Sequence, residues 1–140
     1  MFHYVKSSMN KLRTVLIVDD DALLRSSLDS VLTTVGYRTL TTGDPDAAYR
    51  LLGAEPVTAI LLDVRLPTMS GLALYLAVVR RWPHLLGRIA LMTGDADASD
   101  VRAWVYRNPC AVLRKPFNFQ QVTDWLDSAV QAAERTASAG

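Results

Sequence analysis

The sequence predicts an α/β fold in which a parallel sheet is covered by helices on both faces. Short runs of consecutive apolar residues alternate along the chain with longer stretches whose apolar residues recur at helical spacing. A strand that is apolar at every position has both faces buried, as in the centre of a parallel sheet with helices above and below. Five such alternations, joined by right-handed crossovers, predict a doubly wound sheet.

The composition indicates one domain with its own core. The chain has 140 residues, of which 50% are hydrophobic and 21% charged, so a second domain would not fit. The net charge of +1, with basic residues scattered along the chain, argues against a surface for nucleic acid or membrane. The single Cys110 excludes an internal disulfide, and no signal peptide or transmembrane-length apolar run is present. We therefore expect a cytoplasmic protein.

Three segments differ in character. Residues 1–12 have no periodic pattern and are expected to form a loose leader. Residues 13–133 hold the strand and helix patterns and are expected to form the folded domain. Residues 134–140 are small and polar, which is typical of a tail or a linker.

The first strand is predicted over residues 14–18, an apolar run rich in β-branched residues. It ends on Asp19, Asp20 and Asp21, and Asp21 is well placed to cap the helix that follows. Gly36 supplies a stop for this helix. Its expected apolar face consists of Leu24, Leu28, Val31, Leu32 and Val35.

A short second strand is predicted over residues 37–42, and Asp44 and Pro45 then open a second helix. The apolar face of that helix is thin and consists of Ala47, Ala48, Leu51 and Leu52. Residues 58–62 form a third, central strand that ends on Asp63. Taken alone, Asp63 is equally well explained as a strand cap or a solvated loop residue.

A turn with Pro67 and Gly71 leads from Asp63 into the third helix. Its expected apolar face consists of Leu72, Tyr75, Leu76 and Val79. The fourth strand, residues 88–92, ends on Thr93, and a small, weakly amphipathic helix follows over about 99–106. The fifth strand, residues 111–114, ends on Lys115, and the last helix has the clearest apolar stripe: Val122, Trp125, Leu126, Ala129, Val130 and Ala133.

The strand ends carry polar residues that converge at one edge of the sheet: Asp19, Asp20, Asp63, Thr93 and Lys115. Three carboxylates close together repel one another unless a cation lies among them, and an all-oxygen ligand set favours Mg2+. An ammonium and a hydroxyl opposite these acids suit an arriving phosphoryl group, which Asp63 would carry. Lys115 is the only lysine of the expected folded domain, in a chain with 12 arginines and three lysines.

Four motifs resemble the signatures of response regulator receiver domains of two-component signalling, of the chemotaxis-regulator-like type. They are VLIVDDD at 15–21, LLDVRLPTMSG at 61–71, LMTG at 91–94 and LRKPF at 113–117. The resemblance covers about 13–133. It implies a flavodoxin-like (βα)5 fold with strand order 2-1-3-4-5.

The resemblance also implies the roles of the site residues. Asp63 would accept a phosphoryl group from a sensor histidine kinase or a histidine phosphotransfer protein, and Thr93 and Lys115 would contact that group. Asp20 and Asp63 would bind Mg2+ by their side chains and Arg65 by its backbone carbonyl. Asp19 would act on the metal through water or by orientation. The bond between Lys115 and Pro116 is expected to be cis, as it commonly is in receivers.

A receiver of this kind switches conformation to signal to a partner or an output domain. It catalyses its own phosphorylation and slow hydrolysis, so we expect no separate substrate turnover and no enzyme in the usual sense. Receivers also form homodimers through the face of helix 4, strand 5 and helix 5, and this chain is a candidate for such a dimer.

Some residues depart from the family pattern. Val112 stands where receivers carry a switch aromatic, and residues 107–110 replace a usual glycine-alanine turn. These departures support an alternative function, a receiver-like interaction module that docks partners without phosphoryl transfer. Arg65 is expected either to pair with Asp95 across the mouth of the site or to be solvated independently. Trp104 and Tyr106 are each expected either to face a partner or to pack on the sheet.

Overall fold

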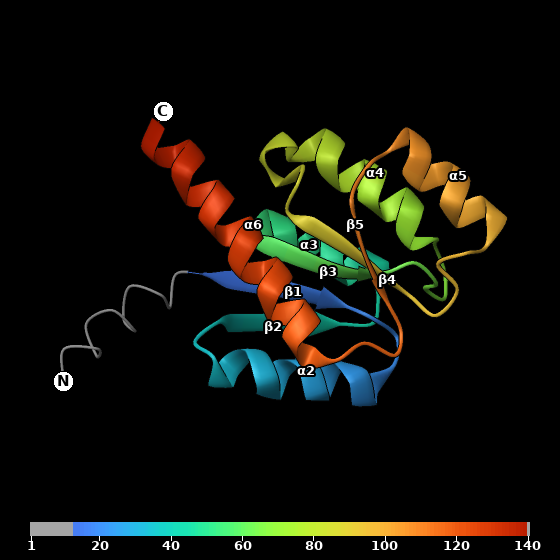
Figure 1. Cartoon of the computed structure of the whole chain (residues 1–140), viewed down its shortest axis with the longest axis horizontal. Coiled ribbons are helices and arrows are strands. Elements are labelled where there is room, and N and C mark those ends of the chain that lie inside the picture. Colours follow the sequence, from blue (N-terminus) through green and yellow to red (C-terminus); the bar gives the residue numbers. More distant parts are fainter. Residues whose placement is uncertain (1–12, 140) are drawn as a thin grey trace.

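A five-stranded parallel sheet forms the centre of the molecule (Figure 1). The computed structural model describes residues 13–139, with side chains to residue 135, so the expected leader at 1–12 lies outside the described residues. The strand order is β2-β1-β3-β4-β5, which confirms the order and the fold class expected from the sequence. The strands are β1 (Thr14–Val18), β2 (Arg38–Thr42), β3 (Ala59–Asp63), β4 (Ile89–Thr93) and β5 (Ala111–Arg114).

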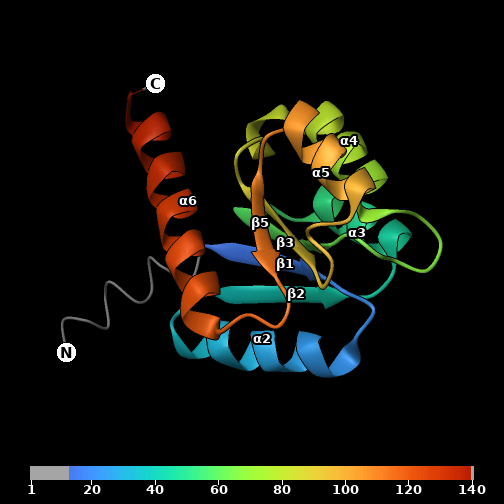
Figure 2. The ribbon, with the colours of Figure 1, turned by 45° about the vertical axis from the view of Figure 1, so that its right-hand side comes forward.

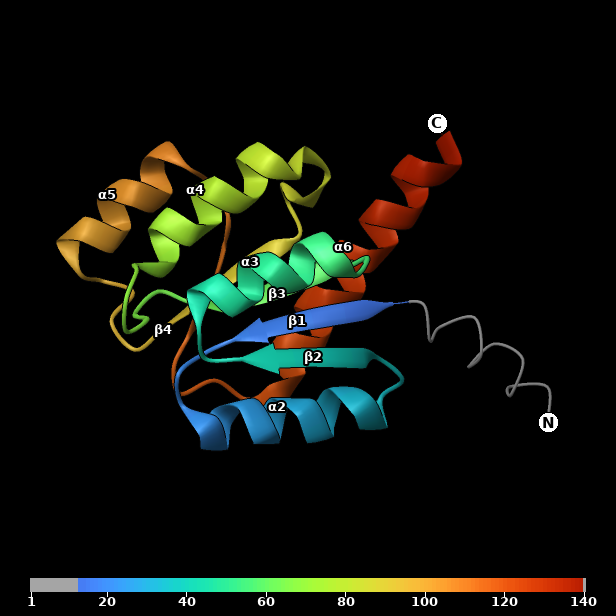
Figure 3. The ribbon, with the colours of Figure 1, turned by 180° about the vertical axis from the view of Figure 1, so that it is seen from behind.

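Helices cover both faces of this sheet (Figures 1 and 3). The helices are α2 (Ala22–Thr34), α3 (Pro45–Ala54), α4 (Gly71–Arg81), α5 (Ser99–Arg107) and α6 (Phe119–Ala139), with a short 3-10 turn η1 (Pro83–Leu85) after α4. Helices α2 and α6 pack on one face, and α3, α4 and α5 pack on the other. A view turned by 45° shows α6 crossing the sheet face beside β5 (Figure 2).

The core consists of two apolar layers, one on each face of the sheet. Alternate residues of the central strands enter opposite layers, because successive side chains of a strand point to opposite faces. The layer under α2 and α6 includes Val15, Ile17, Leu61 and Met92. The layer under α3, α4 and α5 includes Leu16, Leu62, Leu91 and Trp104. The consecutive apolar runs of the sequence are therefore explained by burial on both sides.

The helix caps follow the residue types in the sequence. The side chain of Asp21 accepts hydrogen bonds from the backbone N–H groups of Leu23 and Leu24, at 3.0 and 3.2 Å. Asp44 caps α3 in the same way through Ala47, at 3.1 Å. Both caps were predicted, and each satisfies donors that a helix start leaves unpaired.

The expected apolar face of α4 was right at Tyr75 and wrong at Leu76, whereas Leu72 and Val79 are partly buried against the core. The buried residues are Gly71, Leu74, Tyr75 and Val78, whereas Leu76 is 38% exposed. The helix begins at Gly71, which lies directly against the end of β3, and this contact sets the rotation of the helix. Val35 was also expected in an apolar face and is exposed, because it lies at the C-cap of α2 beyond the last turn that packs on the sheet.

Helix α6 continues into the segment that was expected to be a tail. It is helical to Ala139, and the side chain of Glu134 pairs with Arg13 at the start of β1, with 2.5 Å between nitrogen and oxygen. Residues 134–139 therefore form helix, in keeping with the high helix propensity of their Ala, Glu and Arg residues. Whether this helix serves as a linker stays a prediction.

The described helices include none that combines the length with the apolar character required to cross a lipid bilayer.

Gly71 is required by a close approach between the start of α4 and the end of β3. A Cβ at this position would lie 1.9 Å from the carbonyl oxygen of Asp63, and the Gly71 N–H donates to the carbonyl of Val64 at 2.8 Å. We expect Gly71→Ala to lower the free energy of unfolding by at least about 2 kcal/mol, because backbone must shift to relieve the clash. Gly53→Ala is the matched control, since its Cβ would meet only Trp82 at 3.9 Å.

Urea unfolding of the two variants checks this prediction. Gly53→Ala lies inside α3 and should leave stability unchanged or raise it by up to about 1 kcal/mol. Equal stabilities for the two variants would contradict the steric account of Gly71.

Candidate functional site

Strand register brings Asp19, Asp63 and Lys115 to one place at the carboxyl edge of the sheet. Val18 of β1 pairs with Leu62 of β3, so the acids that follow these residues lie level with each other. The three polar residues each lie two positions after a side chain that packs toward α2 and α6: Ile17, Leu61 and Leu113. The alternation of side chains therefore directs all three toward the same side of the sheet.

The three acids form a compact cluster. One carboxylate oxygen each from Asp19, Asp20 and Asp63 lies within 4.8 Å of the other two. Asp19 is fully buried and Asp63 is 4% exposed, whereas Asp20 is exposed at the rim. The sequence predicted this convergence, and the cluster opens to solvent on the side of Asp20.

Lys115 places its ammonium between two of these carboxylates. Its Nζ lies 2.8 Å from an oxygen of Asp19 and 3.6 Å from an oxygen of Asp63. The backbone N–H of Lys115 donates to the carbonyl of Thr93 at 2.8 Å, which fixes the chain at the end of β5. Although burial lowers it, the pKa of Lys115 is raised above its usual value by the hydrogen bond to Asp19 and by the charges of both acids. The bond to Pro116 is cis, as predicted.

Backbone groups orient the two buried acids. The N–H of Asp21 donates to Asp19 Oδ1 at 2.9 Å, and the N–H of Arg65 donates to Asp63 Oδ1 at 3.1 Å. Sequence reasoning missed Arg25 of α2, whose guanidinium donates to the carbonyl of Asp19 at 2.7 Å. The sequence position could have indicated this contact: Arg25 lies one turn after the helix cap Asp21, and side chains in a helix point back toward its N-terminus, here toward the end of β1.

The pKa of Asp63 is raised from 3.8 to about 6. Burial is the main cause, and the negative charges of Asp19 and Asp20 add to it. The N–H of Arg65 and the ammonium of Lys115 oppose this rise without cancelling it. The cluster therefore carries more negative charge than its one lysine compensates, as the sequence analysis expected for a site that takes a cation.

Thr93 is buried next to this cluster but engages a different partner. Its hydroxyl oxygen accepts a hydrogen bond from the backbone N–H of Asp95 at 3.1 Å. It directly follows Met92, which pairs with Asp63 across the sheet, so Thr93 lies one residue beyond the level of Asp63. Within residues 13–135, no hydrogen bond joins the Thr93 hydroxyl to Asp63 or Lys115.

Arg65 pairs with Asp100 and not with Asp95. Its guanidinium lies 3.7 Å from the Asp100 carboxylate, and both side chains are exposed. Neither expected alternative holds, because Arg65 is paired with a different acid: Asp100 lies in the first turn of α5 and faces the loop that holds Arg65. The backbone N–H of Asp95 donates to the Thr93 hydroxyl instead.

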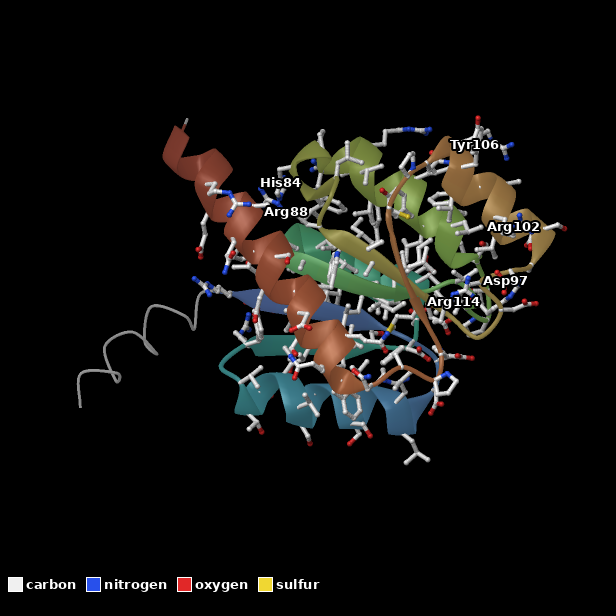
Figure 4. The ribbon with its side chains drawn as sticks, in the orientation of Figure 1. His84, Arg88, Asp97, Arg102, Tyr106 and Arg114 are labelled. Carbon is white, nitrogen blue, oxygen red and sulfur yellow. The ribbon has the colours of Figure 1, made fainter. Side chains whose placement is uncertain are left out.

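The two aromatic residues of α5 have different environments. Trp104 is buried and packs edge-on against Tyr75 of α4, with 5.0 Å between ring centroids. Tyr106 lies at the outer end of α5 and is 88% exposed (Figure 4). It lines a groove of about 420 Å³ between α5 and β5, which Val112 also lines. Val112 is too short to fill this groove as an aromatic ring would.

The donor set of the cluster fits Mg2+. It consists of carboxylate oxygens alone, which hard divalent cations prefer, and the exposed rim at Asp20 leaves room for water ligands. Lys115 approaches from the opposite side and leaves Asp20 without a salt bridge within the described part of the chain.

Comparison with known proteins agrees with this geometry. The family model of the response regulator receiver domain matches residues 15–127. The chain belongs to this family. Receiver domains are signalling domains of two-component systems, and the cluster of Asp19, Asp20 and Asp63 is consistent with their phosphoacceptor site.

Individual relatives show how much of each protein this receiver spans. The hydrogenase transcriptional regulatory protein HoxA of Cupriavidus necator is 33% identical over 126 residues, which cover 88% of this chain but only 25% of HoxA. A CheY-like receiver domain from Methanospirillum hungatei JF-1 has a TM-score of 0.82 at 21% identity, over 90% of this chain and 99% of that one. The response regulator TrrA from Thermotoga maritima, solved in complex with Mg(2+)-BeF, has a TM-score of 0.72 at 22% identity, over 84% and 98%.

This receiver thus corresponds to about a quarter of HoxA, and to nearly all of the two solved chains. At their identities the solved structures bear on the fold alone.

The raised pKa of Asp63 predicts how its carboxyl contributes to the free energy of unfolding at different pH values, with chelator present so that no metal is bound. Because the folded protein binds the Asp63 proton more tightly than the unfolded chain, stability should fall as the pH rises from about 4 to about 6 and stay lower above that. We expect Asp63→Asn to raise the free energy of unfolding at pH 7 by about 1 to 3 kcal/mol, since one pKa unit corresponds to about 1.4 kcal/mol. The gain should disappear below about pH 4.

Urea unfolding at several pH values measures this difference. Asp20→Asn, at the exposed rim of the same cluster, is the matched control and should give a smaller gain. A net loss of stability for Asp63→Asn at pH 7 in chelator would show that its charge is compensated in the folded protein.

Proposed function

We propose that Asp63 accepts a phosphoryl group in a Mg2+-dependent reaction and that the receiver then switches conformation to signal. The main support is the position of Asp63, whose carboxylate is buried between two further acids and lies 3.6 Å from the Lys115 ammonium. A carboxylate that only capped a strand would need neither the acids nor the ammonium. TrrA, which shares the fold, was solved in complex with Mg(2+)-BeF, so Mg2+ and beryllofluoride are the ligands to test on this chain.

The proposed transfer uses Asp63 as a nucleophile. An oxygen of its carboxylate forms a bond to phosphorus while the bond from phosphorus to the histidine nitrogen of the donor breaks. The leaving imidazole then holds its lone pair and takes up a proton from solvent. Bound Mg2+ supplies charge neutralisation and alignment for this in-line transfer. Its ligands would be the carboxylates of Asp20 and Asp63 and the backbone carbonyl of Arg65, with Asp19 acting through water or by orientation.

Two further residues would contact the phosphoryl group. Lys115 already lies near Asp63 and would neutralise one phosphoryl oxygen, keeping its contact with Asp19 or exchanging it. Thr93 would donate its hydroxyl proton to another oxygen. Because the Thr93 hydroxyl oxygen now accepts from Asp95 N–H, this donation requires a rotation of the side chain or a shift of the loop after β4.

The partners follow from this function. The proposed phosphoryl donor is a sensor histidine kinase or a histidine phosphotransfer protein. The proposed homodimer uses the face of α5, β5 and α6, which includes the groove beside Tyr106. We also propose a cytoplasmic location, no direct contact with nucleic acid or membrane, and no turnover of a separate substrate.

The proposed domain division keeps 1–12 as a leader, 13–133 as the receiver and 134–140 as a C-terminal tail or linker. Continuation of α6 to Ala139 supports a helical connection, since such a helix would transmit a movement of the domain along its length.

A second function is favoured by one observation. Val112 leaves the groove between α5 and β5 open where an aromatic ring would lie, so a module that docks partners without phosphoryl transfer would have a surface ready for them. The two functions differ in whether Asp63 is modified.

Phosphorylation of the full chain separates them. With Mg2+ and acetyl phosphate, wild type should gain the mass of one phosphoryl group, and Asp63→Asn should gain none because its amide is not a nucleophile for phosphorus. Asp124→Asn, an exposed acid on α6, is the matched control and should be modified like wild type. Intact-protein mass spectrometry reads out each sample, with chelator in place of Mg2+ as a further arm.

Two results would reject phosphoryl transfer at Asp63: no modification of wild type with Mg2+ present, or modification of Asp63→Asn to the same extent as wild type. The first would favour the docking module.

A further inference from the structure

The ion pair of Arg65 and Asp100 joins two separate segments of the chain. Arg65 belongs to the loop between β3 and α4, and Asp100 belongs to the first turn of α5. Their charged atoms are 3.7 Å apart, and their side chains are 60% and 62% exposed. Among the described residues, no other ion pair connects this loop with α5.

The backbone of Arg65 lies directly against the proposed phosphoacceptor. Its N–H is 3.1 Å from Asp63 Oδ1, so the side chain of Arg65 starts beside the carboxylate that would carry the phosphoryl group. The same side chain ends near Asp100 in the free protein. Arg65 is therefore within reach of two negative groups, of which only one is present before phosphorylation.

We propose that Arg65 is a positioning residue that exchanges partners, from Asp100 in the free protein to the phosphoryl group on Asp63 in the phosphorylated protein. This inference rests on the proposed function. A phosphoryl group carries about two negative charges and several acceptor oxygens in a half-enclosed site, whereas Asp100 offers one solvated carboxylate at a long distance. The exchange therefore proceeds toward the phosphoryl group.

The consequence of the exchange falls on α5. When Arg65 turns to the phosphoryl group, the ion pair between Asp100 in the first turn of α5 and the loop after β3 is broken. The tie that remains runs from Asp97 to Arg114 of β5, two hydrogen bonds of 3.0 and 3.1 Å on the segment just before α5 (Figure 4). Helix α5, which stays packed on the core through Val101 and Trp104, would then shift slightly at its first turn, and Trp104, packed on Tyr75, would report the movement. This route needs no aromatic ring at Val112.

Binding of beryllofluoride in the presence of Mg2+ tests the exchange on the full chain, with tryptophan fluorescence as the readout. Asp100→Asn removes the competitor and should tighten binding by about two- to fivefold, the effect expected of an exposed ion pair. Arg65→Gln keeps the backbone contacts and should weaken binding. In the Arg65→Gln background, Asp100→Asn should change nothing further, because the two residues act through each other.

Asp97→Asn is the matched control. It removes one acid from the same region, but Asp97 pairs with Arg114, so its effect should be equal with and without Arg65. An equal effect of Asp100→Asn in both backgrounds would overturn the exchange, because Asp100 would then act by its charge alone. Absence of beryllofluoride binding in wild type would instead refute the proposed function.

The indole N–H signal of Trp104 gives a structural readout in NMR spectra, with Trp104→Phe to identify it. In free Asp100→Asn this signal should lie between its positions in free and beryllofluoride-bound wild type. A Trp104 signal that binding does not move in wild type would overturn the link to α5.

Discussion

The contact between the Lys115 ammonium and the carboxylates of Asp19 and Asp63 is the interaction on which the site depends. It holds one positive charge among three negative ones, at 2.8 and 3.6 Å from the two buried acids. Without it, the repulsion among these acids would favour protonation of Asp63, whose pKa is already raised to about 6. Lys115 therefore partly neutralises the acids in the free protein, at a site proposed to bind Mg2+ and a phosphoryl group. Binding of Mg2+ or of the phosphoryl group would change the negative charge that surrounds the Lys115 ammonium.

Strand pairing and core packing position the residues of this contact. Parallel pairing sets Asp19 level with Asp63, and side-chain alternation turns both acids and Lys115 toward the same side. The start of α4 presses on the end of β3 so closely that only glycine fits at Gly71, which fixes the loop that carries Arg65. The buried strands are thus the rigid support, and the exposed loops after β3 and β4 hold the groups that are able to exchange partners.

Two features of this receiver bear on the connection between its site and α5. Val112 leaves a groove open where a switch aromatic is expected, and the buried aromatic of α5, Trp104, is packed on Tyr75 and is not free to take its place. At the mouth of the site, Arg65 bridges to α5 through Asp100. Under the proposed exchange, the Arg65–Asp100 pair would connect the site to α5 without an aromatic side chain at position 112.

The sequence by itself determined the alternation of strands and helices, the caps at Asp21 and Asp44, and the strand-end positions of Asp19, Asp63, Thr93 and Lys115. These features are local, because periodicity and capping depend on near neighbours in the chain. Tertiary structure decided the rotation of α4 set at Gly71, the partner of Arg65 and the pair that Glu134 of α6 forms with Arg13. The partner of Arg65 and the pair of Glu134 with Arg13 depend on contacts between segments distant in sequence, and the rotation of α4 depends on how closely its start approaches the end of β3. Residue type encodes neither of these distances.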